Sequence, residues 1–205
     1  MVSLTVNARP VEVRDGATLL EAAQAAGVHV ETLCFHPCWP SHATCRLCLV
    51  EVQVNARPVP ACVTPARQGD VVLTDTVALR EFRAEDAGWL LARHPNDCMH
   101  CEVSGSCRLQ DVVRTNRWEE RWQPGPAGHV GPGGDIRQVP GDHTSPAIWR
   151  DLAMCIECGL CVEACGEAGQ QQHVIGFAGR GEGRLPVTAF ERPLSETNCI
   201  SCGQC

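Results

Sequence analysis

Cysteine is the residue type whose number and spacing indicate chemistry in this chain. Fifteen of the 205 residues are cysteine, and all but Cys38 fall, with one histidine, into four groups at residues 34–62, 94–107, 155–165 and 199–205. Each group contains cysteines separated by two residues, which places soft thiolate ligands close together in a short loop. Thiolates at such spacings hold iron–sulfur clusters. The sequence therefore predicts several clusters, and the chemistry available to them is one-electron transfer.

The first group consists of Cys34, Cys45, Cys48 and Cys62. Two irons bridged by sulfides need four thiolates, and a tight loop together with a residue beyond the next strand can supply them. We therefore predict a [2Fe–2S] site. Zinc and free buried thiols are the alternatives, but a zinc ribbon usually has two close pairs and only one pair is close here. Cys38 is interpreted as a bystander, because the set is complete without it.

The second group has only three cysteines, one fewer than a [4Fe–4S] cluster needs. A lone histidine is usually an ordinary surface or core residue, but His94 lies four residues before the pair Cys98 and Cys101. His94 is therefore the candidate fourth ligand beside these two and Cys107, and His100 is not. A neutral imidazole in place of a thiolate reduces the negative charge at the cluster, which should raise its reduction potential.

The third group is a complete C-x2-C-x2-C-x3-C run, and the fourth repeats it without its last member. The two runs are Cys155, Cys158, Cys161 and Cys165, and Cys199, Cys202 and Cys205. In two-cluster ferredoxins the fourth cysteine of each run serves the other cluster. Cys165 is thus predicted to complete the [4Fe–4S] site of the fourth group. The third group keeps three ligands of a further [4Fe–4S] cluster, and we expect the natural protein to continue and to supply the missing one four residues beyond Cys205.

Residues 1–78 are predicted to form a β-grasp domain that positions the first group. Apolar and polar residues alternate around a turn at Asn7-Ala8, and Thr18 with Glu21 has the capping-box pattern that begins a helix. The expected elements are a hairpin over 4–13, a helix over 18–26 and strands over 47–52 and 71–73. The fold class is therefore α+β.

The remaining chain is predicted to form two more small domains. Residues 79–122 suit a small helical [4Fe–4S] domain, with helices over 76–94 and near 109–118. The first helix is expected to turn Leu79, Phe82, Trp89 and Leu90 inward. Residues 123–146 hold 11 Gly or Pro among 24 and are interpreted as a linker. Residues 147–205 are predicted to be a ferredoxin-like domain with two clusters, and Gly176–Gly181 is interpreted as a turn.

Composition excludes several classes of function. The net charge is −7, and every cationic side chain is Arg. The arginines form no basic cluster, so the chain is a poor candidate for binding nucleic acid. No secretory signal and no run of about 18 apolar residues is present, which argues against a membrane span. The odd number of cysteines fits poorly with full disulfide pairing, so a reducing cytoplasm is the expected compartment. We find no motif for a flavin, a nicotinamide cofactor or a catalytic triad.

The motifs and their order resemble one family. They are similar to the iron–sulfur N-terminal region shared by the large iron–sulfur (G-type) subunit of NADH dehydrogenase, the alpha subunit of NAD-linked formate dehydrogenase and the diaphorase small subunit of NAD-reducing hydrogenase. Residues 44–52 and 60–65 carry the resemblance in the first group, where Ala43 stands at a position that commonly has Gly. Residues 94–101 and 105–110 resemble the His(Cys)3-ligated [4Fe–4S] domain of the same family.

The resemblance implies one [2Fe–2S] and three [4Fe–4S] clusters in an electron-transfer part of an oxidoreductase. It implies a flavin/NAD(H)-binding partner subunit and a distal catalytic subunit or domain, in the cytoplasm or at the inner face of the membrane through a complex. The alternatives are the N-terminal part of a formate dehydrogenase or iron-only hydrogenase catalytic subunit, the G-type subunit of a respiratory NADH-quinone oxidoreductase, or a stand-alone ferredoxin. Respiratory subunits typically lack counterparts of Cys165, Cys199, Cys202 and Cys205, so the chain looks more like the soluble NAD-linked systems.

Overall fold

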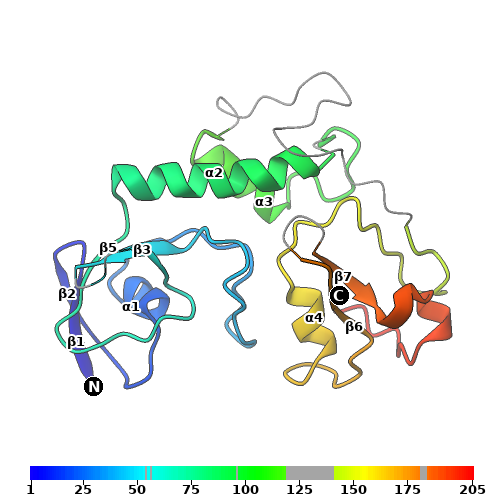
Figure 1. Cartoon of the computed structure of the whole chain (residues 1–205), viewed down its shortest axis with the longest axis horizontal. Helices are drawn as coiled ribbons and strands as arrows, with labels where there is room; N and C mark the ends of the chain where they lie inside the picture. Colours follow the sequence, from blue (N-terminus) through cyan, green and yellow to red (C-terminus); the bar gives the residue numbers. More distant parts are fainter. Residues whose placement is uncertain (54, 56, 96, 119–140, 181–183) are drawn as a thin grey trace. The chain divides into compact units, whose positions relative to one another are not determined.

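The computed structural model describes residues 1–53, 55, 57–95, 97–118, 141–180 and 184–205 (Figure 1). It divides into two compact units, Met1–Leu33 with Ser41–Ala87, and Cys34–Pro40 with Gly88–Cys205. Most of the expected linker over 123–146 lies outside the described residues, and the predicted division into three domains stays a prediction.

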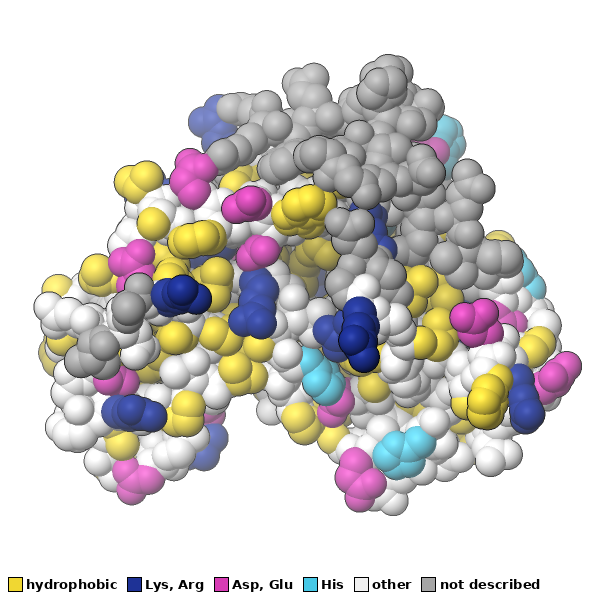
Figure 2. Space-filling view, in the orientation of Figure 1, with side chains coloured by type: hydrophobic (Ala, Val, Ile, Leu, Met, Phe, Trp, Pro, Cys, Tyr) yellow, Lys and Arg dark blue, Asp and Glu magenta, His cyan; other side chains and the backbone are white. Residues whose placement is uncertain are grey.

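Charged side chains of both signs lie on the face of the molecule shown in Figure 2. On the face shown in Figure 2, arginine and acidic side chains occur in small groups among apolar side chains. None of the helices in the described part of the chain combines the length and the apolar character needed to cross a bilayer.

The first unit contains a five-stranded mixed sheet in the order β2-β1-β5-β3-β4. The strands are β1 Val2–Val6, β2 Arg9–Val13, β3 Leu49–Val52, β4 Val59–Pro60 and β5 Val71–Leu73. β1 is antiparallel to β2 and parallel to β5, and β3 is antiparallel to both β4 and β5. This arrangement confirms the predicted β-grasp order. Strand β4 was not predicted, because two residues that include a proline give no periodic signal.

Local sequence explains how the first hairpin and helix form. Asn7 and Ala8 have φ values of 47° and 63°, as a tight two-residue hairpin turn requires. Helix α1, Leu19–Ala25, begins with the predicted capping box. The Thr18 hydroxyl accepts a hydrogen bond from the Glu21 amide at 3.2 Å, and the Glu21 carboxylate accepts one from the Thr18 amide at 2.7 Å. The helix therefore begins where the sequence predicts.

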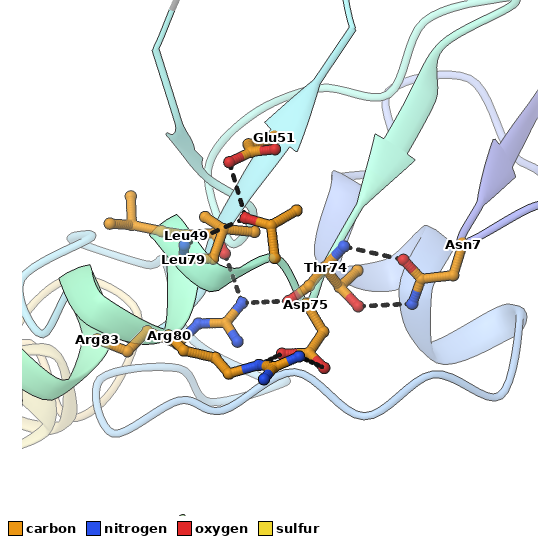
Figure 3. Close-up of polar contacts among 9 residues, drawn as sticks. Asn7, Leu49, Glu51, Thr74, Asp75, Leu79, Arg80 and Arg83 are labelled. Atoms are coloured by element: carbon orange, nitrogen blue, oxygen red, sulfur yellow. Dashed lines mark hydrogen bonds and ion pairs between the residues drawn. The ribbon is translucent and has the colours of Figure 1, made fainter.

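Helix α2, Val77–Arg93, leaves the sheet through a short polar turn. The Thr76 hydroxyl accepts a hydrogen bond from the Leu79 amide at 3.2 Å and donates one to Glu51 at 2.9 Å (Figure 3). Asn7 holds Thr74, which precedes this turn, because its side chain donates to the Thr74 hydroxyl at 2.7 Å and accepts from the Thr74 amide at 2.9 Å. These contacts fix the direction in which α2 starts.

The predicted inner side of α2 is partly wrong. Leu79 is buried, but Phe82 is 45% exposed and Trp89 is 43% exposed. Arg83 and Ala87 are buried instead, at successive spacings of four from Leu79. The spacing of large apolar side chains predicts the inner side of the helix, whereas the structure buries Leu79 together with small alanines and an arginine.

Ala43 is a non-glycine residue in the left-handed region, with a φ of 51°. It is 9% exposed and lies in the loop before the first pair of close cysteines. An L-residue in this region costs about 1–2 kcal/mol, whereas glycine adopts it freely but loses more backbone entropy on folding. We predict that Ala43→Gly raises the free energy of unfolding by roughly 0.5–1 kcal/mol, measured by urea denaturation at matched iron content.

The matched control for this substitution is Ala23→Gly, in the buried interior of α1. There the same change is expected to lower stability by about 1 kcal/mol, because the backbone of Ala23 is helical. A loss of stability for Ala43→Gly as well would show that the left-handed conformation is not costly at this position.

The described part of the second unit contains the end of α2, two further α-helices, two short 3-10 helices and a hairpin. The further elements are α3 Arg108–Thr115, α4 Leu160–Cys165, η3 Ala189–Glu191, η4 Leu194–Glu196, and the antiparallel strands β6 Ile175–Ala178 and β7 Leu185–Thr188. The core formed by Val174, Ile175 and Leu194 packs against Cys161, Cys165 and Cys199, so these three predicted ligands lie on its apolar surface. The interpretation of Gly176–Gly181 as a turn is wrong for its first half, because β6 extends to Ala178.

Candidate metal centres

The four cysteines of the first group are all buried. Cys45 and Cys48 lie in the loop before β3, and Cys62 follows β4. Cys34, which directly follows Leu33, is 1% exposed. The Leu33 amide donates a hydrogen bond to the Cys45 sulfur at 3.4 Å, and such contacts stabilise a thiolate. The donor set is thus one of soft, desolvated sulfurs, which suits an iron–sulfur cluster.

The pairing of β3 and β4 explains the long gap before the last cysteine of this group. Leu49 lies opposite Pro60, and the Ala61 amide donates to the Cys48 carbonyl at 3.0 Å. Cys48 directly precedes β3 and Cys62 follows β4, at neighbouring ends of the two paired strands. The two cysteines are therefore brought together although 13 residues separate them in the sequence. The hairpin brings the last thiol back to the loop that carries the first close pair.

The predicted ligands of the second group line one cavity of about 270 Å³. His94 follows the last residue of α2, Cys98 and Cys101 lie in the next loop, and Cys107 directly precedes α3. His100 does not line this cavity; its side chain is 82% exposed and its Nδ1 contacts the Asp97 carboxylate at 2.8 Å. The two histidines therefore have different surroundings, and the choice of His94 as the ligand stays a prediction.

Three thiols of the third group, those of Cys155, Cys158 and Cys161, lie close enough for their charges to interact. Burial raises the pKa of Cys161 to about 12, and Cys155, Cys158 and Cys205 act in the same direction. Burial also raises the pKa of Cys158 and of Cys205. Without a metal these thiols hold their protons, so binding of a cluster must be accompanied by proton release.

Cys165 lies with the fourth group. One cavity is lined by the sulfur-bearing residues Cys165, Cys199, Cys202 and Cys205. Its wall also includes Val174, Ile175 and Leu194, the core of this unit. The Val174 amide donates a hydrogen bond to the Cys165 sulfur at 3.3 Å. The structure thus brings together the four residues predicted to form a complete set, and this assignment stays a prediction.

The third and fourth groups, which are the two arms of the predicted two-cluster domain, also repeat one backbone conformation. The φ angles are 56° at Glu157, 75° at Gly159, 54° at Ser201 and 71° at Gly203. In each arm the amide two residues after the first cysteine donates to that cysteine's sulfur, at 3.3 Å in the third group and 3.4 Å in the fourth. Turns with left-handed residues gather amides into concave anion sites that many iron–sulfur clusters use. The arms are therefore equivalent in shape as well as in sequence.

Two arginines near these cysteines were not found by sequence reasoning. The positive charge of Arg150 lowers the pKa of both Cys161 and Cys205, and its guanidinium donates to the Pro186 carbonyl at 2.7 Å. Arg93 forms an ion pair with Glu157 at 3.1 Å, and each side chain is 16% exposed. No periodicity or motif marks either residue. Among the described residues, no three His, Cys, Asp or Glu side chains are arranged to hold a single metal ion.

Two family models match the chain. Residues 1–77 match a 2Fe-2S iron-sulfur cluster binding domain, and residues 87–121 match the NADH-ubiquinone oxidoreductase-G iron-sulfur binding region. These matches cover the first and second groups, so both kinds of cluster-binding region are present.

Known proteins match over the whole chain. It is 35% identical to a G-type subunit of NADH-quinone oxidoreductase from Rhizobium meliloti (strain 1021), and 32% identical to NADP-reducing hydrogenase subunit HndD of Solidesulfovibrio fructosivorans. Both matches cover 100% of the chain, but it spans only 23% and 34% of these relatives. A crystal structure of an NAD+-reducing [NiFe]-hydrogenase in the H2-reduced state matches with a TM-score of 0.83 and 31% identity, over 98% of this chain and 80% of that one. The chain belongs to the family of iron–sulfur binding regions found in the G-type subunits of NADH-quinone oxidoreductase and in NAD(P)-reducing hydrogenase subunits.

Proposed function

We propose that this chain is the iron–sulfur electron-transfer module of an NAD(H)-linked oxidoreductase complex. Its four groups supply complete ligand sets for one [2Fe–2S] and two [4Fe–4S] clusters and three ligands of a further [4Fe–4S] cluster, with His94 as the single imidazole. When bound, these clusters accept and release single electrons, while the protein sets their spacing and potential. The buried sulfurs, the cavities and the repeated turns described above support these ligand sets.

The observation that carries this proposal is the central position of the third group within its unit. Met154 and Ile156, on either side of Cys155, line the cavity of the second group. The charge of Arg108, the neighbour of Cys107, acts on Cys158. Cys205 of the fourth group acts on Cys161. A segment that borders residues of the second and fourth groups is suited to pass electrons between them.

The partners follow from the kinds of protein that share this region. The relatives are subunits of NADH-quinone oxidoreductase and of NAD(P)-reducing hydrogenases, which supports a flavin/NAD(H)-binding subunit as one electron partner and a catalytic subunit or domain as the other. The second candidate is that the chain is part of the catalytic subunit itself. The match to a much longer hydrogenase subunit favours this second candidate, because the chain spans 34% of it.

Cys158→Ser tests the relay. Rapid-freeze EPR after addition of less than one electron equivalent follows how electrons redistribute among the clusters. We expect the variant to lose the third group's cluster and, with it, the fast redistribution between the His-ligated cluster and the cluster of the fourth group. Cys38→Ser is the matched control, because Cys38 is exposed and belongs to no proposed ligand set. Unchanged redistribution in a Cys158→Ser protein that lacks the third cluster would contradict the central role.

A further inference from the structure

Arg83 is a buried cation in the first unit. It is 7% exposed and lies on the sheet-facing side of α2. Its Nη2 atom donates hydrogen bonds to the main-chain carbonyls of Leu49 at 2.6 Å and of Thr74 at 2.7 Å (Figure 3). The guanidinium thereby bridges the start of β3 and the residue that follows β5.

Burying the charged guanidinium of Arg83 costs free energy, and not all of its hydrogen-bond donors have an acceptor. Both acceptors are neutral carbonyls, and the Nε atom has no hydrogen-bond partner. Burial lowers the pKa of Arg83, and the negative charges of Asp75, Cys48 and Glu31 act against that change. An arginine remains protonated under these conditions. A buried and unsatisfied donor on a charged group calls for an explanation other than stability.

The position of Arg83 suggests why a buried charge is present there. Leu49, whose carbonyl it binds, directly follows Cys48, and Cys48 is fully buried. A charge in a water-excluded environment acts on its neighbours more strongly than a charge in solvent. The contrast on the same helix is Arg80, which is exposed and already paired with the Asp75 carboxylate through contacts of 2.7 and 3.2 Å.

We propose that Arg83 raises the reduction potential of the [2Fe–2S] cluster through a permanent positive charge held at the carbonyl of Leu49, the residue that follows the Cys48 ligand. This rests on the proposed function, because it requires the cluster. Reduction adds one electron to the cluster, and a nearby cation stabilises the added negative charge. Arg83 forms no bond to the cluster and exchanges no proton with it.

The test is an EPR-monitored redox titration of the full chain with dithionite as the reductant. Arg83→Met removes the charge but keeps similar length, and such replacements of buried ions are often tolerated. We expect the ratio of reduced to oxidised [2Fe–2S] cluster at a fixed potential to fall by about tenfold, which is about 59 mV for one electron. Arg83→Lys keeps the charge and should remain close to the unmodified protein. Arg80→Gln is the control on the same helix and should leave the potential unchanged.

Each outcome decides between the charge and a purely structural role. An unchanged potential in Arg83→Met, or an equal fall in Arg83→Lys, would overturn the proposal. If Arg83→Met and Arg83→Gln lose the cluster while Arg83→Lys keeps it at an unchanged potential, the Arg83→Gln protein is reconstituted at low temperature and titrated. A lower potential of its [2Fe–2S] cluster supports the proposal. An unchanged potential overturns the proposal. Absence of any [2Fe–2S] signal from the unmodified chain would instead refute the proposed function.

Discussion

His94→Ala is expected to remove or degrade the [4Fe–4S] cluster of the second group while the [2Fe–2S] signal survives. The His94 side chain lines the same cavity as Cys98, Cys101 and Cys107, which supply only three thiolates. Without the imidazole one iron loses its protein ligand, and the cluster should lose iron. Iron analysis should show a deficit of one to about four irons per chain, because the affected cluster holds four. EPR at low temperature should show the loss of its signal, while the [2Fe–2S] signal is retained.

His100→Ala is the matched control for this prediction. His100 belongs to the same loop, but its side chain is largely exposed and it is paired with Asp97. This substitution is expected to leave the iron count and the spectra unchanged. Equal losses in both variants would indicate damage to the loop, and an unchanged iron count in His94→Ala would show that His94 is not a ligand.

Local patterns allowed much of the fold and the candidate sites to be predicted. The capping box at Thr18 and Glu21 fixes where α1 begins through contacts only three residues apart. The alternation around Asn7-Ala8 similarly predicts the first hairpin. The close spacing of Cys98 and Cys101 requires them to share a loop, whatever the rest of the chain does. Such features depend on backbone geometry over a few residues, so the sequence alone contains them.

Features that depend on tertiary packing could not be predicted in this way. Arg83 is buried where the carbonyls of Leu49 and Thr74, 34 and 9 residues away in the chain, meet its guanidinium, and nothing in the sequence of α2 marks it. For the same reason Phe82 and Trp89 were assigned to the wrong side of the helix. The approach of Met154 and Ile156 to the cavity of the second group likewise links segments about 50 residues apart in the chain.

Cys165→Ser should destroy the cluster of the fourth group and leave the cluster of the third. In sequence, Cys165 belongs to the run that starts at Cys155, so a ligand set formed within one run would predict the opposite. In the structure it lines one cavity with Cys199, Cys202 and Cys205. Serine keeps the size of the side chain but replaces a soft thiolate by a hydroxyl, a poor ligand for an iron–sulfur cluster. Loss of the fourth group's EPR signal and of up to about four irons is the expected result.

Comparison with two further variants separates the swapped arrangement from the local one. Cys202→Ser should remove the same EPR signal as Cys165→Ser, because both residues serve one cluster in the swapped arrangement. Cys158→Ser should remove a different signal. The double variant Cys165→Ser/Cys202→Ser should therefore lose no more clusters than either single variant, since changes within one unit are not additive. If Cys165→Ser instead matched Cys158→Ser, each run would hold its own cluster, and the cavity shared by Cys165 and the fourth group would have only a packing role.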